Sequence, residues 1–99
     1  MDDARDHVFA ALKKVIDPEL GLDVISLGLI YGVDASDREI VVRMTLTSRH
    51  CPLGAVLTGM ARDALGAVSG GRDVRVEVVW DPPWTPERIS EEGRRALRL

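Results

Sequence analysis

The spacing of apolar residues along the chain predicts alternating helices and strands. Apolar side chains recur every three or four positions from Val8 to Val15, which predicts a helix over residues 4–16. Because proline disfavours helical geometry in the residue before it, Pro18 is expected to end this helix at Asp17.

A polar–apolar alternation follows an apolar loop. Residues 17–28 contain too many apolar side chains for a solvated linker and predict an ordered loop along the domain edge. Residues 29–33 predict a short strand, and residues 34–37 a turn. Residues 39–47 then alternate strictly, with Ile40, Val42, Met44 and Leu46 on one face and Val41, Arg43, Thr45 and Thr47 on the other. A period of two with one apolar face predicts a sheet that helices cover on one side.

The second half of the chain predicts two more helices around a third strand. A central helix is expected to begin at Pro52, a favoured first helical residue, and to end at Gly70-Gly71. Its apolar stripe comprises Leu53, Val56, Leu57, Met60, Ala61, Ala64, Leu65 and Val68. Alternation over residues 74–80 predicts a strand. Thr85-Pro86 is expected to open a last helix that reaches about Leu97.

These elements predict one domain over residues 1–99 with an α+β fold of two layers. The expected order is helix, strand, strand, helix, strand, helix, with a three-stranded mixed sheet and the helices on one face. The first two strands form an antiparallel hairpin, and the third follows a helical crossover and should run parallel to the second. The order of the strands in the sheet is not determined by the sequence.

Composition narrows the class of protein. The 99 residues carry a net charge of −3, with a pI of about 5.3, so binding to nucleic acid regardless of sequence is disfavoured. No apolar run approaches the roughly 20 residues of a membrane span, and the acidic N-terminus is unlike a signal peptide. A single cysteine can form no internal disulfide and no four-cysteine metal site, and a reduced cytoplasmic location is expected.

That cysteine, Cys51, is the main candidate for chemistry. It precedes Pro52, so it is expected at the N-terminus of the central helix, where the dipole and free N–H groups stabilise a thiolate. A thiolate binds metal or attacks electrophiles, whereas a buried cysteine acts as a small hydrophobe. The adjacent His50 is either a solvated side chain or a metal ligand or base.

Two other segments have competing interpretations. Asp17-Pro18-Glu19 is either a helix stop with solvated acids or a pair of carboxylates of which one faces Cys51. In the Pro-rich connection after the third strand, Trp80 is expected to fill the core. Trp84 either covers an edge of the domain or stands exposed as an anchor for a partner.

Four segments together resemble the metal–sulfur cluster biosynthetic family, which includes PaaD-like and SufT-like bacterial proteins and a related eukaryotic cytosolic iron–sulfur assembly factor. The matching segments span about residues 7–97. They are Asp17-Pro18-Glu19, Leu27-Gly28-Leu29-Ile30-Tyr31, Met44-Thr45-Leu46-Thr47-Ser48 followed by Cys51-Pro52-Leu53, and Val79-Trp80-Asp81-Pro82-Pro83-Trp84.

The resemblance implies an iron–sulfur cluster assembly domain and a role in maturing iron–sulfur proteins. The family's characteristic cysteine falls on Cys51, its acidic motif on Asp17 and Glu19, and its threonine on Thr47. Two positions depart from the pattern. Ser26 stands where the family commonly has Asp, which removes one acidic ligand or hydrogen-bond acceptor. His50 stands where it commonly has Gly.

The leading hypothesis is a non-enzymatic accessory factor for the assembly or transfer of an iron–sulfur cluster. Cys51 would be a transient ligand or a contact to the recipient protein, and Asp17, Glu19 and Thr47 would shape its surroundings. One thiolate under-ligates a cluster, so the cluster would be shared with a second copy in a homodimer, with an assembly or recipient protein, or with a small thiol. The alternatives are an adaptor that docks clients through the Trp84 loop and a thiol enzyme that uses Cys51.

Overall fold

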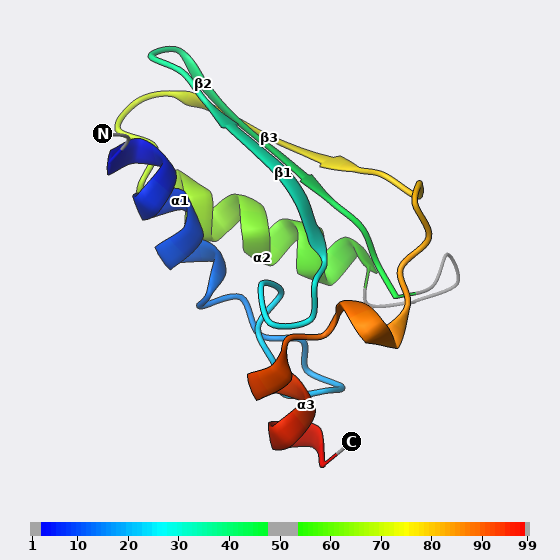
Figure 1. Cartoon of the computed structure of the whole chain (residues 1–99). Helices are drawn as coiled ribbons and strands as arrows, with labels where there is room; N and C mark the ends of the chain where they lie inside the picture. The colour runs from blue at the N-terminus through cyan, green and yellow to red at the C-terminus, as the bar shows by residue number, and fades with distance from the viewer. Residues whose placement is uncertain (1–2, 48–53, 99) are drawn as a thin grey trace.

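A three-stranded sheet with two helices on one face forms the body of the protein (Figure 1). The computed structural model describes residues 3–47 and 54–98. Its elements are α1 (Asp3–Leu12), β1 (Ile30–Ala35), β2 (Glu39–Met44), α2 (Gly54–Ala67), β3 (Asp73–Val78), the 3-10 turn η1 (Pro86–Arg88) and α3 (Glu91–Leu97). The sequence-based prediction of an α+β fold with a mixed three-stranded sheet is therefore confirmed.

The sheet has the order β1-β2-β3, with β2 in the centre. β1 pairs antiparallel with β2, from Ala35 opposite Ile40 to Ile30 opposite Met44. β3 pairs parallel with β2, as expected of a strand reached through a helical crossover. Apolar side chains of the sheet, α1, α2 and the loops form one core cluster of Val8, Leu12, Val15, Val24, Leu27, Leu29, Val33, Ile40, Val42, Met44, Leu46, Leu57, Ala61, Leu65, Val76 and Ile89.

The first helix is shorter than its apolar spacing predicts. It ends at Leu12, and the amides of Lys14 and Val15 donate hydrogen bonds three residues back, from Val15 N to Leu12 O at 3.0 Å. Ile16 then pairs as an isolated bridge with Asp23. The β-branched Val15 and Ile16 favour this extended backbone, so the helix ends well before Pro18.

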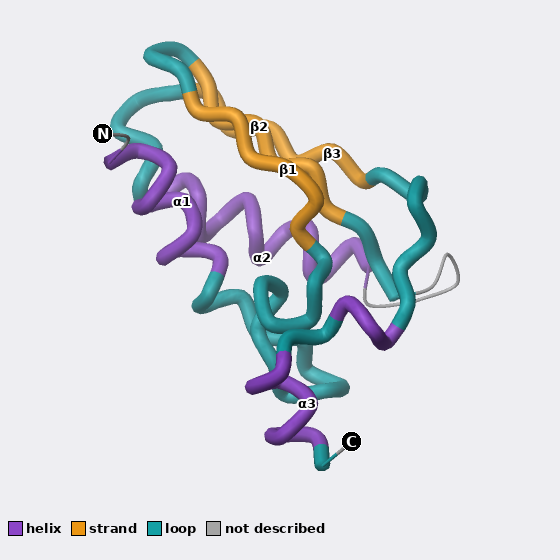
Figure 2. The backbone as a smooth tube through the Cα atoms, in the orientation of Figure 1, coloured by secondary structure: helices purple, strands orange, loops and turns teal. Residues whose placement is uncertain are grey.

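The central helix buries a narrower stripe than the sequence suggests. Its buried residues are Gly54, Leu57, Thr58, Ala61 and Leu65. Val56, assigned to the apolar stripe, is 49% exposed, which corrects that assignment. α2 contacts β3 and α1, and α1 contacts β1. Both helices cover the same face of the sheet (Figure 2).

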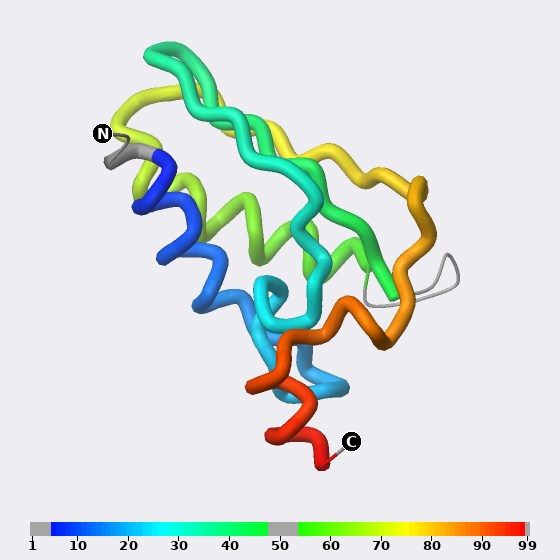
Figure 3. Tube along the Cα trace, viewed as in Figure 1, coloured from blue at the N-terminus to red at the C-terminus, as the bar shows by residue number. Residues whose placement is uncertain are grey.

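The last predicted helix is divided in two. η1 follows Thr85 as a single 3-10 turn, Ile89 is extended, and α3 begins after Ser90. The Ser90 hydroxyl accepts a hydrogen bond from Gly93 N at 3.0 Å, which caps α3 and explains the break in the helix. α3 lies beyond the end of the sheet against the loop of residues 13–29, not on the sheet face (Figure 3).

Thr45 is fully buried just after β2. Within the described residues, its Oγ1 has no hydrogen-bond partner. Replacing Thr45 with valine keeps the side-chain shape and removes the unpaired hydroxyl, so we expect the free energy of unfolding to rise by about 1 kcal/mol. Urea unfolding of the purified variant measures this change.

Thr58 provides the matched control for this substitution. It is also buried, but its hydroxyl donates to Ala55 O at 3.1 Å, so Thr58→Val removes a satisfied group. The control should bring no gain in stability. An equal gain in both variants would show that the unpaired hydroxyl of Thr45 is not the source.

Candidate functional site

A cavity of about 270 Å³ lies at one end of the domain, between the loop after α1 and the chain that follows β2. Its lining residues are Asp17, Glu19, Leu20, Thr47 and Trp84. We call it the rim cavity. It brings together three residues that the sequence singled out as candidates, Asp17, Glu19 and Thr47, although they come from segments nearly 30 residues apart.

The Asp17 carboxylate holds the turn that forms one wall of the rim cavity. Asp17 is 5% exposed, and its Oδ1 accepts hydrogen bonds from Glu19 N at 2.7 Å and Leu20 N at 3.2 Å. Its backbone also takes part, because Asp17 N donates to Leu22 O and Gly21 N donates to Asp17 O, both at 2.8 Å. Asp17 therefore positions the acidic turn.

Glu19 has a different environment from Asp17. Its side chain is exposed and lines the rim cavity, while its backbone N–H is held by Asp17. Of the two acids in the motif, Glu19 thus presents a solvent-accessible carboxylate to this space, and Asp17 keeps it there. The two roles could not be separated by sequence spacing alone.

Trp84 forms another wall of the rim cavity. Its indole Nε1 donates to Leu27 O at 2.7 Å, and its partly buried ring packs against the core cluster. The expectation that Trp84 covers an edge describes this arrangement better than a freely projecting anchor. Trp80 is also partly buried against the core, so it contributes to the core without being enclosed by it.

The remaining candidate residues are not among the described residues that line the rim cavity. Cys51 and His50 lie outside the described residues, and Thr47 is the described candidate nearest to them in the chain. Ser26 does not line the rim cavity. Its backbone N–H donates to Asp23 Oδ2 at 3.0 Å, and its carbonyl accepts from Ser90 N at 2.7 Å. In residues 3–47 and 54–98, no group of three or more His, Cys, Asp or Glu side chains is placed to hold a metal ion.

Sequence reasoning missed Leu20 as part of this site. Leu20 is 38% exposed next to Glu19, and it lines the rim cavity with Trp84. A large apolar residue in an otherwise polar turn is the signal that would have identified it. A second, larger cavity on the sheet face also went unnoticed, because its residues come together only through the fold.

Comparison with known proteins supports a relationship over most of the chain. Residues 5–78 match the family described as "Iron-sulfur cluster assembly protein". The chain is 38% identical to the Fe-S protein maturation auxiliary factor YitW of Bacillus subtilis, over 96% of this chain and 94% of that protein. It is 42% identical to the Fe-S protein maturation auxiliary factor SufT of Staphylococcus aureus, over 84% of this chain and 96% of that protein.

Solved structures agree with the sequence comparison. A domain of unknown function from Bacillus anthracis superposes with a TM-score of 0.91 at 36% identity, covering 99% of this chain and 94% of that one. A conserved hypothetical protein from Thermotoga maritima superposes with a TM-score of 0.83 at 45% identity, covering 96% and 94%. No helix in the described part of the chain has the length and apolar character to cross a membrane. The resemblance inferred from four short motifs is thus confirmed, and the chain belongs to the iron–sulfur cluster assembly protein family.

Proposed function

We propose that this protein is a non-enzymatic auxiliary factor in the maturation of iron–sulfur proteins, with the cluster as its cargo at the rim cavity. The observation that carries the proposal is the meeting of Asp17, Glu19 and Thr47 around one cavity, at the start of the chain segment that leads to Cys51. The names of relatives, which are maturation auxiliary factors and cluster carriers, support the same role.

Cys51 supplies the soft ligand in this proposal. Iron–sulfur clusters are held by cysteine thiolates, so Cys51 coordinates one iron while the cluster is in transit. Glu19 offers a hard oxygen donor from the acidic turn, because its carboxylate is accessible while that of Asp17 is occupied by the turn. Thr47 lines the same cavity as Glu19, and His50 is an additional candidate ligand.

One cysteine cannot complete a cluster site. Cysteine thiolates are the usual ligands of a cluster, four in number, and the chain has a single cysteine, so further ligands are needed. We propose that they come from a second copy of this chain, from a recipient or assembly protein, or from a small thiol. Incomplete ligation suits a carrier, because cargo held by few ligands is released readily to a recipient with a full set.

The adaptor alternative uses the Trp84 loop without metal. The described geometry favours it less, because the indole N–H is already bonded to Leu27 O and the ring is half-buried. A Trp84 side chain engaged in this way supports the cavity wall more than it supplies a free docking anchor. A thiol enzyme would need a base beside Cys51 that a third group holds, and Cys51 and His50 both lie outside the described residues.

Anaerobic reconstitution with iron and sulfide tests the proposal. The wild-type protein is expected to gain visible absorption from a bound cluster, with one cluster for two chains in size-exclusion chromatography when no small thiol is added. Adding glutathione should allow one cluster for each chain, since the thiol supplies the missing ligands. Cys51→Ala should bind no cluster under either condition. Equal absorption from wild type and Cys51→Ala would refute the ligand role.

A further inference from the structure

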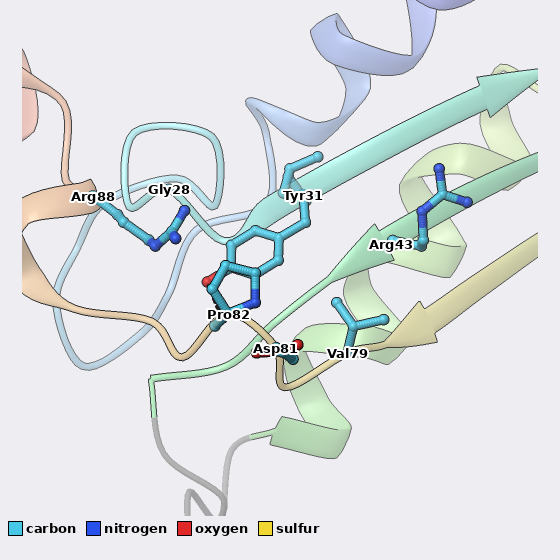
Figure 4. Close-up of a pocket in the computed structure, with 8 residues that line it drawn as sticks. Gly28, Tyr31, Arg43, Val79, Asp81, Pro82 and Arg88 are labelled. Carbon is cyan, nitrogen blue, oxygen red and sulfur yellow. Dashed lines mark hydrogen bonds between the residues drawn. The ribbon is translucent and has the colours of Figure 1, made fainter.

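A second cavity, of about 610 Å³, opens on the face of the sheet that α1 and α2 leave uncovered (Figure 4). Arg43 lies between the inward-facing Val42 and Met44 on β2, which places its side chain on this outer face. The cavity shares no lining residue with the rim cavity. We call it the sheet-face pocket, and the side chains that matter to it are Tyr31, Arg43, Val79, Asp81, Pro82 and Arg88.

A β-bulge brings Tyr31 into the sheet-face pocket. The register between β1 and β2 shifts between Ile30 and Gly32, so Tyr31 is the extra residue and lies beside Gly32 opposite Arg43. Bulges re-aim side chains in this way. The Tyr31 hydroxyl then donates to Pro82 O at 2.9 Å, which fixes the ring against the turn after β3.

Arg43 is held flat against the sheet on the other side of the pocket. A Cβ on Gly32 would lie 2.7 Å from Arg43 Nη2 and 2.9 Å from Nε, so the guanidinium occupies the space above that glycine. Its Nη2 also lies 2.8 Å from Asp34 Oδ2. The charge of Arg43 is therefore balanced in part by Asp34, and its position is restrained.

Arg88 contributes a positive charge of a different kind. Its guanidinium carbon lies 4.8 Å from the centre of the Tyr31 ring, an arrangement typical of a cation–π contact. Across residues 3–47 and 54–98, the ion pairs join Arg43 to Asp34, Arg75 to Glu77 and Arg95 to Glu91, so none engages Arg88. The stacked guanidinium is thus pre-oriented and keeps its hydrogen-bonding edge available for an anion.

The pocket also has an apolar part. Val79, the Tyr31 ring and Pro82 provide carbon surface between the two arginines (Figure 4). Asp81, which lies between Pro82 and Val79 in Figure 4, brings an exposed carboxylate to this part of the lining and disfavours a second negative charge on the body of a ligand there. The volume lies within the range of about 300–1,000 Å³ that small-molecule sites occupy.

We propose that the sheet-face pocket binds a small organic anion. A carboxylate or phosphate group of the ligand contacts Arg88, and an apolar or aromatic body packs on Tyr31, Val79 and Pro82. Arg43 adds positive potential at the far side. This binding site is independent of the proposed handling of clusters at the rim cavity.

Titration followed by ¹⁵N–¹H NMR tests this site with benzoate and phenyl phosphate as probes. Both anions are expected to shift the backbone amides of Tyr31, Val79, Asp81 and Arg88. Benzyl alcohol, which has the ring without the charge, and inorganic phosphate, which has the charge without the ring, should each bind at least about tenfold more weakly. For benzyl alcohol that factor corresponds to the loss of one charge-assisted hydrogen bond, and for inorganic phosphate to the loss of the buried ring. Equal binding of benzyl alcohol or of inorganic phosphate would overturn the proposal.

Substitutions locate the binding. Arg88→Gln should weaken benzoate binding by about tenfold or more, because it removes the charged hydrogen bonds to the anion. Arg95→Gln is the matched control, since Arg95 is an exposed arginine on α3 whose ion pair is with Glu91, and its affinity should equal that of wild type. If Arg88→Gln does not fold, Val79→Glu places a negative charge in the pocket and should abolish binding. Unchanged affinity in a folded Arg88→Gln or Val79→Glu variant would refute the site. It would leave the cluster-assembly proposal, which reconstitution tests, untouched.

Discussion

Replacing Cys51 with alanine is expected to remove the protein's support of iron–sulfur enzyme maturation. Substitution of residues that merely orient metal ligands reduces affinity or activity by about 10- to 100-fold, so loss of a ligand itself should reduce maturation by at least about tenfold. The measurement is the activity of a recipient iron–sulfur enzyme in cells that lack the gene and carry either the wild-type or the variant copy. Circular dichroism of the purified variant establishes that its fold is retained.

Variants of two acidic residues sharpen this test. Glu19→Gln keeps the size of the side chain and removes the accessible carboxylate at the rim cavity, so maturation should fall by a smaller factor than in Cys51→Ala. Glu92→Gln is the matched control, because Glu92 is an exposed residue in the first turn of α3 that does not line the rim cavity. Full maturation by Cys51→Ala would favour the adaptor alternative, in which the cysteine has no role in binding.

Replacing Gly28 with alanine is expected to destabilise the fold by about 3 kcal/mol or more. Gly28 has a φ of +74°, where an L-residue with a Cβ is disfavoured by roughly 1–2 kcal/mol. A Cβ there would also overlap Arg88 O and would lie 2.8 Å from the Arg88 carbonyl carbon. Since these are backbone atoms, rotation of a side chain cannot relieve the clash, and part of the total stability of about 5–15 kcal/mol is lost.

Gly21 offers a matched comparison for Gly28. Its φ is +73°, but a Cβ at Gly21 would meet no heavy atom within 4 Å. Gly21→Ala should therefore lower the free energy of unfolding by the conformational term alone, about 1–2 kcal/mol. Urea unfolding of the two variants separates the effects. Equal losses at both positions would mean that the approach of Arg88 to Gly28 contributes nothing.

The fold could be predicted from the sequence where one pattern dominates a segment. The alternation from Ile40 to Met44 and the apolar stripe of α2 predict the sheet and its crossover helix, because each places a row of apolar residues in the core, although Val41 on the other face of β2 is buried as well. The predicted helix boundaries were wrong where another interaction ends the helix early. Ser90 caps α3 and divides the last helix, and Ile16 pairs with Asp23 in an extended bridge soon after α1 ends.

The two cavities differ in how much of each could be predicted from the sequence. Asp17, Glu19 and Thr47 were proposed as neighbours of Cys51, and that relation to Cys51 stays a prediction. The different roles of Asp17 and Glu19 depend on hydrogen bonds within the turn. The spacing of residues in the sequence does not reveal these bonds. The sheet-face pocket could not be predicted from the sequence. Tyr31 reaches it through a β-bulge, and Arg88 comes from a turn far along the chain.

The ties between the segments 26–31 and 82–90 have a consequence for the timing of folding. Two of them, Tyr31 to Pro82 and Leu27 to Trp84, join residues separated by 51 and 57 positions. Contacts across such separations require closure of a long loop and form late relative to local structure. On a ribosome that adds about 5–20 residues each second, the loop at 26–31 waits several seconds for these partners. The rim cavity therefore acquires its Trp84 wall only after most of the domain has been synthesised, and a nascent chain that ends before Trp84 lacks this wall.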